Sequence, residues 1–299
     1  MIKIDKVSKS FGNLKALDNF SITIKSGSVM GLVGSNGSGK STIIRILSGV
    51  YSPDSGSIEI DDNKIVDNHF VKGLCCFVSD FPYFANNDTL EGCARLYRSI
   101  YPNWDDEKFV KLCGMFPIEK KKRVIKMSKG MQRQVALILA LSTCPKYLFL
   151  DEIFDGLDPV VRQLVKKLII DDMLENEMTV VIASHNLREL EDFCDSIGFV
   201  HNGKVLLESE LDNLKLDLHR IQVAFENELP EDALSSLDIA TIKKQGSLYN
   251  IVVRGDIDKV YSVINTFNPK FCESVPLTLE EIFVSEMEVA GYDIDNILK

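Results

Sequence analysis

Hydrophobic and polar residues alternate near the start of the chain in a way that predicts short β-strands. Alternation runs through Ile2–Val7 and Phe20–Ile24, and an unbroken apolar run follows at Val29–Val33. A period of two residues is typical of a strand with one buried face, whereas a short apolar run is typical of a fully buried strand. After a glycine-rich turn, helical spacing predicts a helix over Thr42–Val50. We therefore expect the order strand, glycine-rich loop, helix.

The middle of the chain continues this alternation of strands and helices. A helical but irregular pattern extends from about Leu90 to Thr143, and the apolar segment Tyr147–Leu150 predicts a buried strand. A helix is expected over about Val160–Leu174 and a strand over Thr179–Ala183. Strands separated by helices predict an α/β fold with a mainly parallel core sheet.

The pattern changes after about Leu211, and the following residues carry none of the motifs described below. The elements expected there are, in order, a strand at Arg220–Phe225, a helix at Glu231–Leu237, strands at Ile239–Lys244 and Tyr249–Arg254, a helix at Asp256–Phe267, a strand at Phe271–Leu277 and a helix at Leu279–Glu288. This order suggests a ferredoxin-like α+β module. We expect one domain at residues 1–211, with a helical subdomain at about 88–145, and a small accessory domain at 212–299.

Composition narrows the range of partners. The chain has 299 residues, with 34 basic and 44 acidic side chains and a formal charge of −10, so nucleic acid is not expected as the main ligand. Seven scattered cysteines form no CxxC pair and no zinc spacing, which predicts a reducing cytosol. Neither a signal peptide nor a bilayer-spanning apolar run is evident, so a membrane role would require a partner.

One segment fits the phosphate-binding pattern G-x-x-x-x-G-K-[ST] between an expected strand and an expected helix. It consists of Gly34, Ser35, Asn36, Gly37, Ser38, Gly39, Lys40, Ser41 and Thr42. Glycines allow several backbone N–H groups to face one centre, and the helix N-terminus adds positive potential. Lys40 would bind the β and γ phosphates, and the Ser41 hydroxyl would ligate Mg²⁺. The segment predicts nucleotide binding, but many families with different reactions share it.

Two adjacent carboxylates follow the strand Tyr147–Leu150. Asp151 and Glu152 would lie at the carboxyl edge of the sheet, where ligands of open α/β folds collect. Asp151 would hold Mg²⁺, and Glu152 would polarise the water that attacks the γ-phosphate. The alternative is an acidic pair that caps the next element.

Taken in order, these and further segments resemble the ATP-binding cassette (ABC) ATPase family over residues 1 to about 220. The further matches are Phe11 for the aromatic that stacks on adenine, Ser128 and Gly130 in Met127–Gln132 for the signature segment, Asp158 in Gly156–Pro159 for the subunit-contact loop, and His185 for the switch histidine. The resemblance implies ATP and Mg²⁺ as cofactors and a P-loop cassette fold with an antiparallel β subdomain and a helical subdomain. It also implies a dimer in which Ser128 contacts the γ-phosphate bound to the opposite subunit.

The sequence departs from the family pattern at several of these positions. Asp80 stands where the family carries a glutamine, and a carboxylate there could still ligate Mg²⁺. Lys129 and Met131 change the signature segment, and Ile153 replaces the usual proline after the catalytic glutamate. These changes leave open whether turnover is fast.

We expect a cytoplasmic ATP-hydrolysing subunit of an ABC transporter, peripheral to the membrane, that drives a separate permease as a homodimer or heterodimer. Aromatic residues in Phe81–Phe84 and Tyr97–Trp104 resemble those of exporter ATPases for bacitracin and lantibiotics, and either dock the permease or pack within the helical subdomain. Two alternatives remain: a soluble ABC-type ATPase, and a slow regulatory cassette that senses ATP.

Overall fold

Two compact units make up the chain, Met1–Glu208 and Ser209–Lys299. The computed structural model describes residues 1–65, 68–226 and 234–289. Within these residues no helix is both long and apolar enough to cross a membrane.

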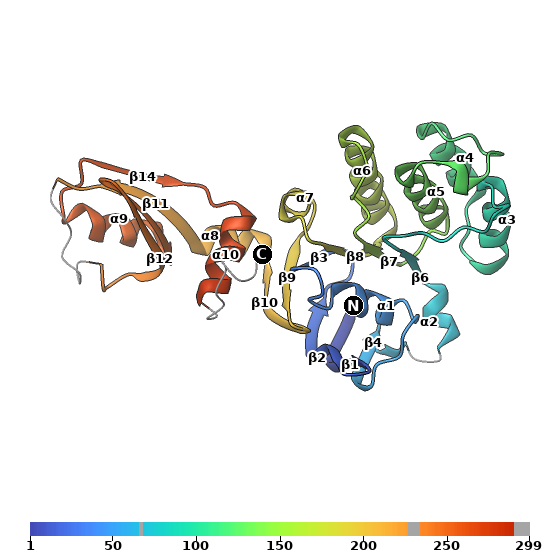
Figure 1. The fold of residues 1–299 in the computed structure, drawn as a ribbon, viewed down its shortest axis with the longest axis horizontal. Coiled ribbons are helices and arrows are strands. Elements are labelled where there is room, and N and C mark those ends of the chain that lie inside the picture. The colour runs from blue at the N-terminus through green and yellow to red at the C-terminus, as the bar shows by residue number, and fades with distance from the viewer. Residues whose placement is uncertain (66–67, 227–233, 290–299) are drawn as a thin grey trace. The chain divides into compact units, whose positions relative to one another are not determined.

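The first unit contains a six-stranded sheet in the order β10-β9-β3-β8-β7-β6 (Figure 1). Its strands are β3 (Val29–Val33), β6 (Cys75–Val78), β7 (Tyr147–Asp151), β8 (Thr179–Ser184), β9 (Ser196–His201) and β10 (Lys204–Glu210). The pairs β3–β8, β3–β9, β6–β7 and β7–β8 are parallel, as the alternation of strands and helices predicts. Strands β3, β7 and β8 are buried along their whole length, which explains their continuous apolar runs.

A second, four-stranded sheet in the order β2-β1-β4-β5 forms the expected antiparallel subdomain. It contains β1 (Ile2–Phe11), β2 (Leu14–Ile24), β4 (Ser55–Ile60) and β5 (Asn63–Lys64). No strand was expected from sequence at Ser55–Ile60, where Ile58 and Ile60 alternate with polar residues and pair with β1. Helix α1 (Lys40–Leu47) shares one buried core with both sheets through Ile43, Ile44 and Leu47. This core fixes the helix that follows the glycine-rich loop.

Three helices of the expected helical subdomain gather at one end of the first unit (Figure 1). These are α3 (Leu90–Ile100), α4 (Asp106–Met115) and α5 (Lys129–Ser142), and the longer α6 (Pro159–Asn176) follows β7. Helices α3, α4 and α5 begin after Thr89, Asp105 and Ser128, whose side chains each accept a backbone N–H three residues later. Such capping satisfies donors that have no partner in the helix. The unit also contains the short helices α2 (His69–Gly73) and α7 (Leu187–Glu191) and a 3-10 helix at Val124–Lys126.

An antiparallel sheet in the order β12-β13-β11-β14 forms the centre of the second unit. Its elements are α8 (Leu211–Asp217), β11 (Leu218–Ala224), β12 (Asp238–Gln245), β13 (Leu248–Arg254), α9 (Ile257–Asn265), β14 (Phe271–Val275) and α10 (Leu279–Val289). This strand order is the one that the predicted ferredoxin-like module requires. The expected helix Glu231–Leu237 lies partly outside the described residues, and Leu234–Ser236 form a turn.

Candidate functional site

The glycine-rich loop joins β3 to α1 in a tight curve that tolerates no side chain at two of its positions. A Cβ at Gly34 would lie 2.1 Å from the Val200 carbonyl oxygen, and one at Gly39 would lie 2.7 Å from that of Ala16. Gly37 and Gly39 have φ of 80° and 112°, which glycine adopts without strain. The expected phosphate-binding residues therefore occupy the predicted turn, with α1 beginning at Lys40.

Lys40 is almost fully buried at the base of this loop. Its ammonium donates to the carbonyl oxygens of Gly34 at 2.6 Å and Ser35 at 3.1 Å, and lies 3.9 Å from Glu152 Oε1. Burial lowers the pKa of Lys40, while the charges of Glu152 and Asp151 oppose that change. The cation thus lies between the loop and the carboxylate pair.

Asp151 is the last residue of β7, and its side chain is completely buried. Ser41 Oγ donates to Asp151 Oδ1 at 2.8 Å, whereas Oδ2 has no hydrogen-bond partner among the described residues. Burial raises the pKa of this carboxyl, with Asp80 and Glu152 acting in the same direction and Ser41 and Arg45 opposing it. A buried oxygen without a partner is costly unless another group binds it. Hard oxygen ligands of this kind fit Mg²⁺.

Glu152 and His185, expected from sequence as the catalytic pair, lie in contact. His185 Nδ1 is 2.9 Å from Glu152 Oε2, and the His185 backbone N–H donates to the same oxygen at 3.3 Å. Glu152 has a φ of 48°, a conformation that is uncommon for residues other than glycine. Ligand atoms of Glu152, Asp155 and His185 all lie within 4.8 Å of one another. Asp155 was not among the site residues expected from sequence.

Asp80 follows β6 and joins the site through two arginines that sequence analysis missed. Arg45 Nη2 lies 3.6 Å from Asp80 Oδ1 and 3.8 Å from Asp151 Oδ2. Arg133 donates through Nε and Nη2 to the Asp80 carbonyl oxygen at 3.1 and 3.0 Å. The sequence signal at this position was the carboxylate of Asp80 in place of the family glutamine.

The remaining candidates lie elsewhere in the same unit. Ser128 caps α5, and Asp158 caps α6 by accepting from Val160 and Val161 at 3.0 Å. Among the described residues, no hydrogen bond or ion pair joins Ser128, Gly130 or Asp158 to the glycine-rich loop. A Cβ at Gly130 would lie 2.8 Å from the Gly156 carbonyl oxygen, so the two expected contact segments adjoin.

The aromatic side chains singled out from sequence differ in their exposure and in the rings they contact. Phe11 is 42% exposed, with its ring edge-on to Tyr51 at 5.3 Å. Tyr97 stacks on Tyr101, and Trp104 packs against Phe109, so these rings stabilise the helical subdomain. Phe81 and Tyr83, in the segment after Asp80, are 67% and 91% exposed.

Comparison with known proteins agrees with this geometry. The model of the family described as "ABC transporter" matches residues 17–155. The lantibiotic transport ATP-binding protein SrtF of Streptococcus pyogenes is 33% identical over 76% of this chain and 99% of its own length. The bacitracin transport ATP-binding protein BcrA of Bacillus licheniformis is 34% identical over 72% of this chain and 71% of its own.

Solved structures resemble most of the chain, and sequence similarity to some relatives extends over both units. A dimeric bacterial ABC transporter cassette superposes with a TM-score of 0.64, at 25% identity, over 71% of this chain and 99% of that one. The ABC transporter ATP-binding protein YtrB of Bacillus subtilis is 29% identical over 96% of this chain and 98% of its own length. Relatives at 33% and 34% identity over most of their own length show the family, and the chain is a member of the ABC transporter ATP-binding proteins.

Proposed function

We propose that this protein is the ATP-hydrolysing subunit of an exporter-type ABC transporter, closing as a dimer around two Mg-ATP and driving a separate membrane permease. The observation that carries the proposal is the buried Asp151 Oδ2, which accepts no hydrogen bond from the described residues and lies beside Ser41, one residue from the Glu152–His185 contact. That arrangement provides a cation site next to a candidate base, as phosphoanhydride hydrolysis requires.

Nucleotide binding is assigned to the glycine-rich loop. Its backbone N–H groups and the N-terminus of α1 would receive the phosphates, with Lys40 on the β and γ phosphates and Phe11 on the adenine. Ser41, Asp151 and Asp80 would hold Mg²⁺, which neutralises charge that develops on the phosphates. The 2.8 Å contact between Ser41 and Asp151 already places two of these oxygens together.

Water activation is assigned to Glu152. Its carboxylate accepts from the His185 backbone and lies against the His185 ring, so its orientation is fixed before any substrate binds. His185 is 46% exposed and is therefore accessible to a γ-phosphate. In this proposal His185 positions Glu152 and senses the loss of the phosphate.

Dimerisation follows from the separation of the two halves of the site. In the described part of the chain, Ser128 and the N-terminus of α5 form no hydrogen bond or ion pair with their own loop, and a helix N-terminus favours phosphate. Each site would combine one subunit's loop with the other's Ser128, Gly130 and Asp158. A homodimer and a heterodimer with a second ATP-binding subunit both satisfy this requirement.

Permease docking is assigned to Phe81 and Tyr83. Large exposed rings give contact area at low entropic cost. The adjacent Asp80 is held by Arg133 through its carbonyl and lies beside Arg45, so movement of this segment reaches the nucleotide site. Residues 1–211 would form the cassette and 212–299 an accessory domain. The protein would lie at the cytoplasmic face of the membrane and bind no nucleic acid.

The decisive experiment is affinity capture of tagged Glu152→Gln with Mg-ATP from detergent-solubilised membranes. Glu152→Gln should abolish turnover while retaining ATP, trapping the closed dimer with its permease. A Phe81→Ser/Tyr83→Ser pair in this background should lose the multi-spanning protein, whereas Leu174→Ser, at an equally exposed apolar position on α6, should retain it. Capture of soluble proteins alone by an ATP-bound dimer would contradict the transporter role and favour a soluble ATPase.

The departures at Asp80 and Lys129 favour a second candidate, a slow ATP-sensing cassette. Single-turnover hydrolysis by wild type, compared with Glu152→Gln, distinguishes the two functions. We expect wild type to exceed the variant by about 100-fold or more, as for the loss of a general base. Equal rates would favour the sensor.

A further inference from the structure

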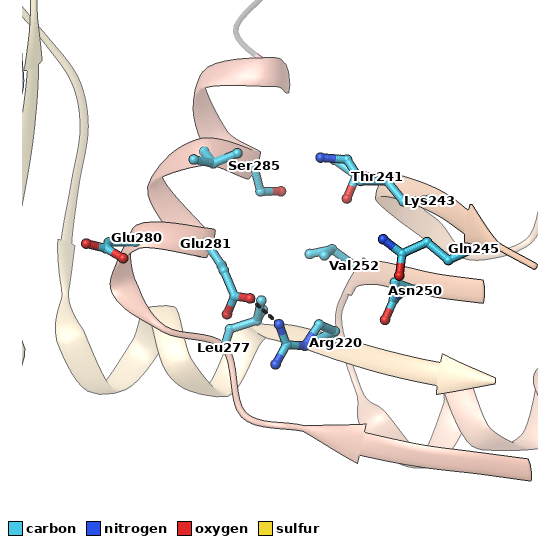
Figure 2. Close-up of a pocket in the computed structure, with 11 residues that line it drawn as sticks. Arg220, Thr241, Lys243, Gln245, Asn250, Val252, Leu277, Glu280, Glu281 and Ser285 are labelled. Carbon is cyan, nitrogen blue, oxygen red and sulfur yellow. Dashed lines mark hydrogen bonds and ion pairs between the residues drawn. The ribbon is translucent and has the colours of Figure 1, made fainter. Parts of the chain in front are cut away.

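We propose that the second unit binds a small carboxylate with a short apolar body in a pocket between α10 and its sheet. The pocket has a volume of about 360 Å³, at the small end of ligand sites. Figure 2 shows Glu281 and Ser285 of α10 facing Arg220 and Val252 of the sheet, whereas Glu280 points away from them. Its lining comprises Arg220, Thr241, Lys243, Gln245, Asn250, Val252, Leu277, Glu280, Glu281, Val284 and Ser285.

The pocket exists because the two faces of this sheet differ. Ile221 and Ile251 are paired, and they pack on one face with the core that includes Val260 and Ile264 of α9. The neighbouring pair Arg220 and Val252 points to the opposite face, because side chains alternate along a strand. On this second face, α10 covers a surface that is partly polar.

Two buried polar atoms in the pocket lack a partner among the described residues. Ser285 is 2% exposed, and its Oγ has no hydrogen bond. Arg220 Nε is likewise buried and unpartnered. Figure 2 shows the Ser285 hydroxyl pointing from α10 toward the sheet. Leaving such atoms unbonded is costly, so a molecule that bonds both is favoured.

The Arg220 guanidinium is held in position by other residues of the second unit. Arg220 Nη1 forms an ion pair with Glu281, whose other oxygen accepts from the Thr278 backbone N–H at 3.0 Å and hydroxyl at 3.1 Å. Glu281 N–H donates in return to Thr278 Oγ1 at 3.3 Å, which forms a capping box at the start of α10. The guanidinium is therefore held in place before a ligand arrives, which lowers the entropic cost of binding.

The chemistry of these atoms selects the ligand. Arginine Nε is a donor only, and charged donors bond most strongly to a carboxylate. The Ser285 hydroxyl is a further unpaired donor in the wall of the same pocket. Val252 and Leu277 are 9% and 8% exposed and provide apolar contact for a short hydrocarbon chain. A small organic carboxylate satisfies all three requirements together.

The test uses the full chain and three probes of equal length: sodium butyrate, butyramide and 1-butanol. Binding is followed by NMR of labelled Val and Leu methyl groups, with sodium chloride as the salt control. We expect saturable butyrate binding in the millimolar range, with shifts at Val252 and Leu277. Butyramide and butanol should bind at least about tenfold more weakly, because a charged acceptor bonds more strongly to a charged donor.

Two variants and a matched control locate the site. Ser285→Ala and Arg220→Lys, which keeps the charge but removes Nε, should each weaken butyrate binding about fivefold or more. Ser262→Ala, at an exposed serine of α9, should leave it unchanged. Absence of saturable butyrate binding, equal binding of butyramide, or unchanged affinity in both pocket variants would overturn the proposal.

Discussion

At the scale of single residues, Asp80 and Arg45 show how one substitution in a common motif is accommodated. The family glutamine is neutral, whereas Asp80 adds a negative charge near Asp151 and raises the pKa of that buried carboxyl. Arg45 lies within 4 Å of both carboxylates and acts in the opposite direction. The arginine therefore offsets the charge that the substitution introduces.

This compensation predicts a non-additive pair of mutations. Arg45→Gln leaves two like charges facing each other and should lower Mg-ATPase activity about tenfold, or 1.4 kcal/mol. Asp80→Gln should restore most of that loss in the double variant, because it removes the repulsion and its amide oxygen can still ligate Mg²⁺. Steady-state rates and urea unfolding of the metal-free protein complete the double-mutant cycle. Additive losses would show that the two side chains act independently.

At the scale of elements, the start of α5 is packed directly against the loop before α6. The carbonyl oxygen of Gly156 lies 2.8 Å from where a Gly130 Cβ would be, and Arg133 Nη1 lies 3.0 Å from the corresponding point at Gly156. Arg133 also holds the Asp80 carbonyl. Three segments far apart in sequence are thus joined around one arginine.

Gly130→Ala should therefore separate these segments and reduce ATP hydrolysis about tenfold, through displacement of α5 against backbone that cannot give way. Gly114→Ala in α4 is the matched control, since a Cβ there meets nothing within 4 Å and should stabilise the helix by up to about 1 kcal/mol. Thermal unfolding and ATPase rates measure the two effects. If the two variants had the same ATPase rate and thermal stability, the close approach of Gly130 to Gly156 would have no functional consequence.

At the scale of the whole molecule, the proposed dimer divides each catalytic site between two subunits. Lys40→Ala removes the phosphate-binding cation from both loops, and Ser128→Arg obstructs both α5 N-termini. Neither variant alone should hydrolyse ATP at more than about 1% of the wild-type rate. Thermal unfolding transitions that match the wild type would show that both variants fold.

Mixing the two variants should restore hydrolysis, because a mixed dimer has one site with both an intact loop and an intact Ser128. If subunits exchange freely and sites act independently, an equimolar mixture recovers about one quarter of wild-type activity. Measuring the rate of ATP hydrolysis as a function of the mixing ratio tests this prediction. Activity that stays at the level of the separate variants would favour sites contained within one subunit.

Some of this organisation could be predicted from sequence because it is local. The glycine-rich loop lies between Val33 and Lys40, and its pattern specifies a turn, a buried strand and a helix over adjacent residues. The pair Asp151–Glu152 ends an apolar strand for the same reason. Helical spacing identified the subdomain over 88–145, but its interruptions at Tyr101 and Phe116 became visible only as helix ends.

Other expectations could not be resolved by pattern. The aromatic residues Phe81–Phe84 and Tyr97–Trp104 were equally consistent with docking and with packing. The fold separates them, since Tyr97 and Tyr101 stack within the subdomain while Phe81 and Tyr83 remain exposed. Exposure depends on neighbours from several elements, which periodicity along one segment does not specify.

The sequence by itself determined the glycine-rich loop, the carboxylate pair, the parallel sheet and most of the element order of the second unit, because each depends on the local alternation of apolar, polar and glycine residues. Only the tertiary structure decided that Arg45 lies between Asp80 and Asp151, that His185 contacts Glu152, and that Arg220 and Ser285 meet in one pocket. These contacts join residues that lie 33 to 106 positions apart in the sequence and belong to different elements. Strand register and helix packing set such distances, and neither can be predicted from a single segment.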